Sequence, residues 1–279
     1  MPSWTLTLTH PTQGRTFQRP LDPTELAFFW DGRFNGTEDS LHHAELRLLN
    51  ASRDVHIFSD ANIVKAWLST KRRHPLAGAT VQVLPLDTPI VPCRLKEADS
   101  KAEGGGGDSV PALGLEPHFV IREHDLAVLR AHEIVFEQVA CAEEIPQRMA
   151  AIWEGPRPLS DELLVRLYVF RETDPQRTDV LHLMTLIAHC VTDGTANRTF
   201  LRCLLDTLAR GGELDSEPAQ IPLEERLGML IPSADLEPVH LRLHSPARRR
   251  WRRAIGAVIF QLRMEKGQVG TYCRSSTSS

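Results

Sequence analysis

Two side chains that can act on protons stand four positions apart at the end of an apolar run. They are His189 and Asp193 in the segment His189-Cys190-Val191-Thr192-Asp193-Gly194. Histidine exchanges a proton near neutral pH, so His189 can serve as a base on a hydroxyl or an amine. Asp193 can pair with a nearby arginine and hold the shape of the loop. Gly194 lets the chain turn sharply into the next element.

The elements around this segment predict a strand, a turn and a helix. Residues 180–189 form a nearly continuous apolar run of strand length, which predicts a strand buried on both faces. After Gly194, apolar residues recur at helical spacing as far as Gly211-Gly212. An alternative interpretation is a core histidine followed by an aspartate helix cap. H-x-x-x-D is a weak pattern, and its spacing alone favours that alternative.

Other chemistry at this segment has less support. A metal site could combine His189, Asp193 and His182, but two histidines seven apart on a strand point to opposite faces and lie roughly 23 Å apart. We therefore expect no metal. Cys190 is expected to be a small buried hydrophobe, because neighbours on a strand face opposite ways. No G-x-S-x-G occurs, so a serine-hydrolase elbow is not indicated.

Four further polar or flexible stretches have ordinary interpretations. The basic run 248–253 could contact phosphate groups or an anionic membrane, but a solvated helix face is the more common explanation. Gly104 to Gly107 lie in a polar stretch without a GK[ST] signature, so a mobile loop is expected over about residues 94–111. His42-His43 and Arg72-Arg73-His74 are expected at the surface.

The composition excludes several classes of protein. The chain has 279 residues, 42% hydrophobic and 24% charged, with a net charge of −4 and 6% aromatic residues. This balance provides no drive toward nucleic acid. Five cysteines without a C-x-x-C indicate neither a zinc site nor a disulfide framework. No secretory signal or membrane-spanning run is visible, so a cytoplasmic protein without membrane partners is expected.

Helices and strands mix along the chain without strict alternation. Asp22-Pro23-Thr24-Glu25 and Ser59-Asp60 each predict a helix start, and Pro75 ends the second helix. Strands are predicted over 44–49, 80–84, 118–122, 133–139 and 163–170, and further helices over 142–153 and 246–264. The expected fold class is α/β, a two-layer sandwich of a mixed sheet with flanking helices. We expect one lobe over residues 1–264 and a disordered tail over 265–279.

The segment around His189 resembles the H-H-x-x-x-D-G core of nonribosomal peptide condensation domains. Its shorter form, H-x-x-x-D, marks alcohol acetyltransferases of the chloramphenicol-acetyltransferase-like superfamily. Ala188 replaces the first histidine of the doubled motif, which fits the acetyltransferases better. Three other segments agree in order with family motifs: Leu21 to Glu25 with L-x-P-x-[EQ], Val64 to Leu76 with the helix ending in R-H-P-x-L, and Gly155 to Arg166 with G-P-L-x-R.

The resemblance implies the N-terminal lobe of a two-lobed fold with the active site between the lobes. His189 would take the proton of an alcohol or amine as it attacks a thioester, Asp193 would hold the loop, and Gly194 would open the helix. The acyl donor would be a thioester of coenzyme A or of a carrier protein's phosphopantetheine, used as a co-substrate, with no tightly bound cofactor. Donor and acceptor identities stay open.

The resemblance also implies a second lobe with a D-F-G-W-G-like segment, and nothing of that kind follows Met264. We therefore expect one lobe that needs a second lobe, or self-association, to complete its site. The alternative is an inactive, truncated remnant that acts, if at all, as a binding or interaction module.

Overall fold

The computed structural model describes residues 3–10, 14–35, 39–49, 56–85, 115–174, 177–211, 221–231 and 251. The chain divides into two units, Met1–Ala234 and Asp235–Ser279. In the second unit, only Trp251 is described, as a helical and exposed residue. The predicted loop at 94–111, the tail at 265–279 and the rest of the helix predicted over 246–264 lie outside the described residues.

A mixed four-stranded sheet carries the predicted site. Its strands are β3 (Asp39–Arg47), β8 (Val180–Ala188), β7 (Val165–Glu172) and β6 (Ile134–Val139), in the order β3-β8-β7-β6. β6 and β7 pair in parallel and the other pairs are antiparallel. Every residue of β8 is buried, as its continuous apolar run predicts. The prediction of a mixed sheet is confirmed.

A second, antiparallel sheet was not predicted as a separate unit. It has the order β1-β2-β5-β4, with β1 Thr5–His10, β2 Gly14–Pro20, β5 Leu115–Arg122 and β4 Thr80–Pro85. β4 and β5 correspond to two predicted strands, whereas β1 and β2 were missed. Gly14 has a φ of 71° and begins β2 after the turn from β1, a conformation that suits glycine.

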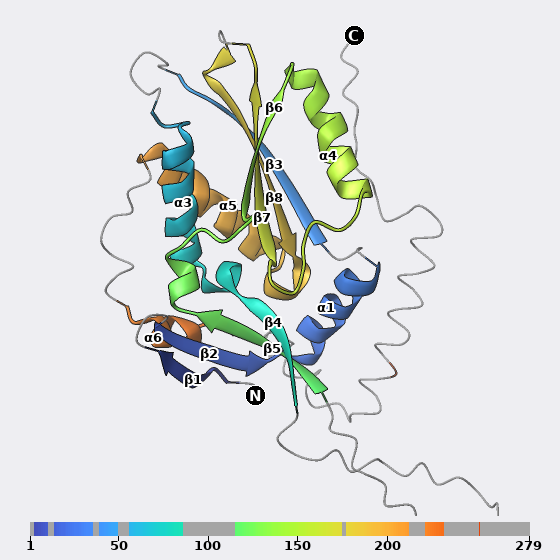
Figure 1. The fold of residues 1–279 in the computed structure, drawn as a ribbon, viewed down its shortest axis with the longest axis vertical. Helices are drawn as coiled ribbons and strands as arrows, with labels where there is room; N and C mark the ends of the chain where they lie inside the picture. Colours follow the sequence, from blue (N-terminus) through green and yellow to red (C-terminus); the bar gives the residue numbers. More distant parts are fainter. Residues whose placement is uncertain are drawn as a thin grey trace, which may run out of the picture. The chain divides into compact units, whose positions relative to one another are not determined.

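Helices cover both faces of the mixed sheet. The helix α5 (Gly194–Ala209) packs beside α3 (Asp60–Arg73), where Trp67 meets Phe200 edge to face. Ile187 of β8 lines a cavity with α5 residues, whereas Leu186 lines one with the end of α4 (Ile145–Glu154). Because neighbouring residues of a strand face opposite ways, α5 and α4 lie on opposite faces of the sheet. Figure 1 shows this arrangement.

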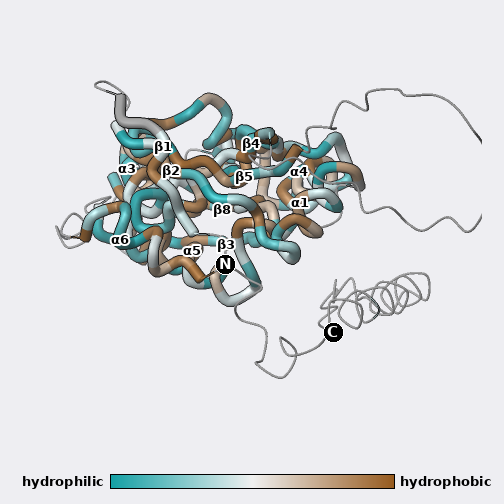
Figure 2. Tube along the Cα trace, turned by 90° about the horizontal axis from the view of Figure 1, so that it is seen from below, coloured by the Kyte–Doolittle hydropathy of each residue, from teal (hydrophilic) through white to brown (hydrophobic). Residues whose placement is uncertain are grey.

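The remaining elements are the helix α1 and several short helical segments. They are α1 (Pro23–Asn35), α6 (Leu223–Gly228) and four 3-10 turns: η1 (Pro75–Gly78), η2 (His124–Leu126), η3 (Ala142–Glu144) and η5 (His189–Val191). Hydrophobic and hydrophilic stretches alternate along much of the chain in Figure 2, as expected for elements covered on one side. No helix in the described part of the chain is long and apolar enough to span a bilayer.

The start of α1 is a capping box, as its sequence predicts. Asp22 accepts hydrogen bonds from the backbone N–H groups of Thr24 and Glu25 through Oδ1, and the Glu25 carboxylate accepts one from the N–H of Asp22 at 2.8 Å. Glu25 also pairs with Arg19 of β2 through two hydrogen bonds of 2.7 Å, and both side chains are buried. This ion pair joins the antiparallel sheet to α1.

The end of α3 differs from the sequence prediction. Ser59 caps the start of the helix and His74 its end, as predicted for a helix that stops before Pro75. Lys71, however, is fully buried and donates to both oxygens of Glu133. His74 is also largely buried against Phe200 rather than at the surface, while Arg72 and Arg73 are exposed. The predicted surface position of Arg72-Arg73-His74 is confirmed for Arg72 and Arg73, whereas His74 is only partly exposed because it packs against Phe200.

Candidate functional site

His189 begins the turn between the buried strand and the following helix. β8 ends at Ala188, η5 carries His189, and α5 begins at Gly194. The imidazole is stacked on the ring of Phe28 of α1, with centroids 4.2 Å apart and an angle of 1° between the planes. The side chain is only partly buried, so solvent or a small molecule can reach it. The strand-turn-helix prediction is confirmed.

The tautomer of His189 follows from its hydrogen bond. Its Nδ1 lies 2.7 Å from the backbone carbonyl oxygen of Thr192. Because a carbonyl oxygen only accepts, Nδ1 carries the proton and donates it. In the neutral imidazole, Nε2 is then unprotonated and can accept a proton. The ring is thus held in the tautomer that a general base needs.

Asp193 is the N-cap of α5. Its Oδ1 accepts hydrogen bonds from the N–H groups of Thr195 and Ala196, at 2.9 and 2.7 Å. No ion pair with arginine is found for it among the described residues, so its contacts are those of a helix cap. The geometry leaves Asp193 as a residue that organises the turn. Gly194 opens the helix, and a Cβ atom built there would meet nothing within 4 Å.

Cys190 and His182 have no place in chemistry at His189. The Cys190 thiol is buried, and burial raises its pKa to about 12, which makes it a poor nucleophile. His182 is buried on β8 and its Nδ1 lies 3.3 Å from Nε2 of His43 on β3. Among the described residues, no group of three or more histidine, cysteine, aspartate or glutamate side chains could hold a metal ion.

The prediction that His42 and His43 lie at the surface is confirmed for His43, which is exposed, whereas His42 is partly buried. His43 is stacked on His182 with ring centroids 5.5 Å apart, and the Nε2 atom of His42 is buried. Burial lowers the pKa of His43 and of His182. Of the two stacked rings, His182 is buried and His43 is exposed.

An ion pair that the sequence did not reveal lies next to His189. Asp39 is the register partner of Ala188 across the β3–β8 ladder. Its two carboxylate oxygens accept hydrogen bonds of 2.6 and 2.7 Å from Nε and Nη2 of Arg157. Burial lowers the pKa of Arg157, but the hydrogen bonds and charge of Asp39 outweigh it and leave that pKa raised. Arg157 is therefore firmly charged.

Two glycines make room for this ion pair. A Cβ atom on Gly32 of α1 would come within 3.0 Å of Nη2 of Arg157 and 3.4 Å of Oδ1 of Asp39. Gly155 ends α4, where a Cβ atom would lie 2.6 Å from the carbonyl oxygen of Ala151. A side chain at Gly155 would thus displace the segment that leads to Arg157. The contact with the Ala151 backbone explains glycine at position 155, whereas at position 32 a side chain would press on the end of the Arg157 side chain.

Sequence reasoning missed Phe28, Asp39 and Arg157 as parts of the site. Arg157 stands in the Gly155-Pro156-Arg157-Pro158 segment, whose resemblance to a family motif was the one available signal. Phe28 and Asp39 lie far from His189 along the chain, and only the packing of α1 and the register of β3 bring them close. No local pattern could reveal those contacts.

A small apolar cavity lies on the α5 side of the turn. It has a volume of about 110 Å³, and its wall includes Val191, Thr192 and the largely buried His74. Burial, with a smaller contribution from Arg73, lowers the pKa of His74 to about 4. His74 is therefore neutral near pH 7.

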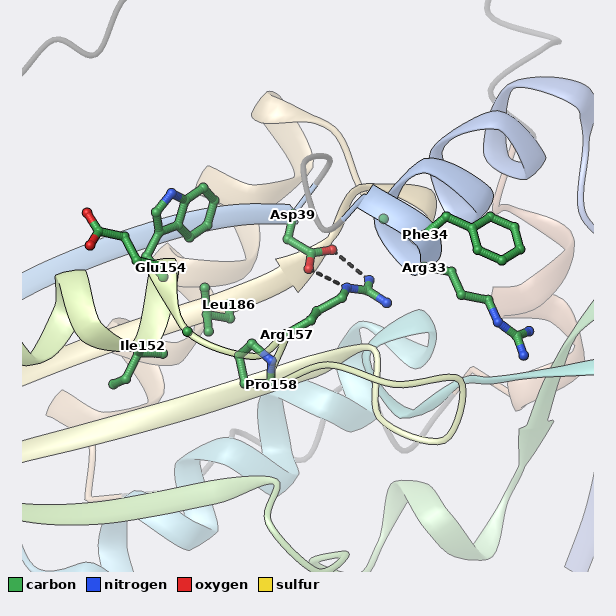
Figure 3. A pocket seen from close by; sticks show the side chains of 11 residues that line it. Arg33, Phe34, Asp39, Ile152, Glu154, Arg157, Pro158 and Leu186 are labelled. Atoms are coloured by element: carbon green, nitrogen blue, oxygen red, sulfur yellow. Dashed lines mark hydrogen bonds and ion pairs between the residues drawn. The ribbon is translucent and has the colours of Figure 1, made fainter.

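A larger cavity lies on the α4 side. It has a volume of about 340 Å³ and contains the Asp39–Arg157 pair in its wall. Figure 3 shows the bidentate pair between Phe34 and Arg33 on one side and Glu154 on the other. The size falls within the range of pockets that take small molecules.

Known structures share this fold. No model of a known protein family matches the chain, and no curated protein matches it. The trichothecene 15-O-acetyltransferase TRI3 from Fusarium sporotrichioides superposes with a TM-score of 0.54 at 14% identity, over 92% of this chain and 47% of that protein. The X-domain solved with OxyB from teicoplanin biosynthesis has a TM-score of 0.45 at 17% identity, over 80% of this chain and 38% of that one.

The condensation domain of the monacolin K polyketide synthase MokA has a TM-score of 0.44 at 12% identity, over 72% of this chain and 36% of that one. The chain spans less than half of the length of each of these three proteins. The superposition on TRI3 confirms the resemblance at the level of the fold. The chain has, over that length, the α/β fold of this acetyltransferase.

Proposed function

We propose that this chain supplies the base for acyl transfer from a thioester to an alcohol or amine. The observation that carries the proposal is the orientation of His189. Its Nδ1 is committed to the Thr192 carbonyl and its ring is held flat against Phe28, which leaves Nε2 as the proton acceptor. The acyltransferase fold supports the same chemistry.

The proposed reaction balances around Nε2 of His189. The acceptor hydroxyl oxygen attacks the thioester carbonyl carbon while Nε2 takes the hydroxyl proton. This attack forms the new C–O bond and gives a tetrahedral intermediate. The C–S bond then breaks to leave the ester, and the imidazolium returns the proton to the departing thiolate sulfur. Asp193 takes no part in the proton transfer and fixes the turn as the cap of α5. The donor is proposed to be a thioester of coenzyme A or of a carrier-bound phosphopantetheine.

The two-lobed arrangement of the family is part of this proposal. The region that contacts the thioester would come from a second lobe, from another chain or from a second copy of this one. Where no such partner completes the site, the alternative is a binding module without turnover.

A thiol-release assay with the full chain tests the proposal. The chain is incubated with acetyl-CoA and a panel of alcohols and amines, and both free thiol and acylated product are measured. Product formation that disappears in His189→Asn supports the proposal. Product that survives the substitution contradicts the proposal, whereas no product from the full chain with any acceptor favours the binding module.

A further inference from the structure

The aromatic ring that lies on His189 belongs to a helix that is firmly held. α1 packs against η5, the turn that carries His189. Three residues before Phe28, the carboxylate of Glu25 accepts two hydrogen bonds of 2.7 Å from the buried Arg19 of β2. The next residue, Phe29, is 3% exposed and part of the core. The ring of Phe28 is therefore supported in its position by the fold itself.

The stack turns the π face of Phe28 toward the whole imidazole. The two ring centroids are 4.2 Å apart and the planes differ by 1°. The face of a benzene ring carries the negative part of its quadrupole. A cation within about 6 Å of the ring centroid is attracted to that face. The contact therefore stabilises a positive charge on the imidazole of His189 more than it stabilises the neutral ring.

A positive charge on His189 has few other groups to stabilise it. Nδ1 donates to the carbonyl oxygen of Thr192 at 2.7 Å. The neighbouring carboxylate of Asp193 accepts hydrogen bonds from two backbone N–H groups of α5. Within the part of the chain that the structure describes, no carboxylate forms an ion pair with His189. The Thr192 carbonyl and the Phe28 ring are thus the two groups in contact that favour an imidazolium.

We propose that Phe28 is a positioning residue for His189, whose π face holds the imidazole in plane and stabilises the positive charge that the ring gains when Nε2 takes a proton. Its part in acyl transfer rests on the proposed function, in which His189 is the base. The imidazolium forms only after the proton has moved, so the contact should raise kcat and leave KM for the thioester unchanged. The stabilisation of charge rests on the stack alone.

Fluorinated phenylalanines at position 28 test the electrostatic part of the proposal. Fluorine withdraws electron density from the ring face while the ring keeps nearly the same size, so the stack remains and the attraction for a cation falls. The full chain is prepared with phenylalanine, 4-fluorophenylalanine or 3,4,5-trifluorophenylalanine at this position. With acetyl-CoA and an alcohol of the panel above, kcat should fall stepwise, by about fivefold for the trifluoro ring. An unchanged kcat across the series would overturn the proposal.

Carbethoxylation of His189 provides a second measurement that needs no turnover. Diethyl pyrocarbonate transfers an ethoxycarbonyl group to an unprotonated imidazole nitrogen, and positive charge develops on the ring during the attack. Because Nδ1 donates to Thr192, Nε2 is the nitrogen that reacts. The rate at His189, followed by mass spectrometry of its peptide, should fall about threefold from phenylalanine to the trifluoro ring. A rate independent of fluorination would contradict the proposal.

Phe136 provides the matched control. It is an exposed phenylalanine on β6, and the same fluorinated residues there should leave both rates unchanged. Phe28→Leu keeps an apolar contact without a π face, so it should lower both rates while the melting temperature changes little. Phe28→Tyr restores an aromatic face and should restore most of both rates. Equal rates in the leucine and tyrosine variants would show that the π face contributes nothing.

The two measurements separate this inference from the proposed function. If carbethoxylation of His189 depends on fluorination while the wild type shows no thioester turnover, the proposed function fails and the effect of Phe28 on the imidazole holds. If turnover requires His189 but neither rate responds to fluorination at Phe28, the proposed function holds and the role of Phe28 fails.

Discussion

The imidazole of His189 lies flat on the ring of Phe28, although 161 positions separate the two residues in the sequence. Phe28 covers one face of the imidazole, and the Thr192 carbonyl oxygen accepts a hydrogen bond from Nδ1. The Nε2 atom is the ring nitrogen that is left for chemistry. The contact joins the first long helix of the chain to the turn that carries the proposed base.

Replacing His189 by asparagine removes the base but keeps a donor for Thr192. The asparagine amide can donate to the same carbonyl oxygen that Nδ1 contacts. Acyl transfer should fall by about a hundredfold or more, while the melting temperature should change little. His189→Leu is the control that also removes the donor, and it should lower stability as well as turnover. Melting curves and thiol release distinguish the two effects.

Asp193 should tolerate asparagine and not alanine. Both aspartate and asparagine accept the N–H bonds of a helix N-terminus, whereas alanine cannot. Asp193→Ala should lower the free energy of unfolding by about 1 kcal/mol, and Asp193→Asn should stay close to the wild type. Urea denaturation checks this. A large loss of stability with asparagine would show that the negative charge matters beyond the cap.

Arg157 and Asp39 should show strong coupling. Removing one partner leaves a charge in a largely buried position, since the side chains are 19% and 6% exposed. Arg157→Met or Asp39→Asn alone should cost about 3 kcal/mol of stability, and the double variant should cost less than the sum of the two. A double-mutant cycle measures the coupling. Simple additivity of the two losses would mean that the ion pair contributes nothing specific.

Stability should decrease in mild acid because of His74. Its pKa is lowered to about 4 by burial, whereas an unfolded histidine has an ordinary pKa of about 6.5. As the pH falls, His74 is therefore protonated in the unfolded chain before it is protonated in the folded chain. The neutral His74 contributes fully to the free energy of unfolding above pH 6.5, and this contribution is lost as the pH falls toward 4. The shift corresponds to about 3 kcal/mol at most.

His74→Phe should remove part of this acid sensitivity while keeping an aromatic contact with Phe200. Unfolding measured at several pH values between 4 and 7 gives the comparison. His124→Gln, at an exposed histidine, is the matched control for the loss of one imidazole. If the wild type and His74→Phe lose stability in parallel, then His74 does not carry the effect.

Local patterns predicted the elements around the site better than the contacts between them. The apolar run before His189, the cap at Asp22 and the stop at Pro75 are properties of neighbouring residues, and the structure confirms each of them. The partial burial of His74 depends on Phe200 of α5, and the stacking of His43 depends on His182 of β8. The residue type of a histidine does not predict which distant residue it contacts in the fold.

Register and close packing explain the remaining misses. Asp39 reaches Ala188 only because β3 pairs with β8 in one register, which apolar alternation along β3 does not specify. β1 and β2 lie on one side of the antiparallel sheet, with many polar residues and few fully buried ones. Strands of that kind give a weak signal, since their periodic face is only partly covered.

The ion pair between Arg19 and Glu25 has a mechanical consequence for the whole helix that follows it. α1 is clamped to β2 at its first turn, supports the imidazole through Phe28 at its second, and borders the cavity through Gly32 at its third. A rotation of α1 would therefore move Phe28 and Gly32 together. The positions of His189 and of the larger cavity therefore both depend on α1, which the Arg19–Glu25 ion pair holds at its first turn.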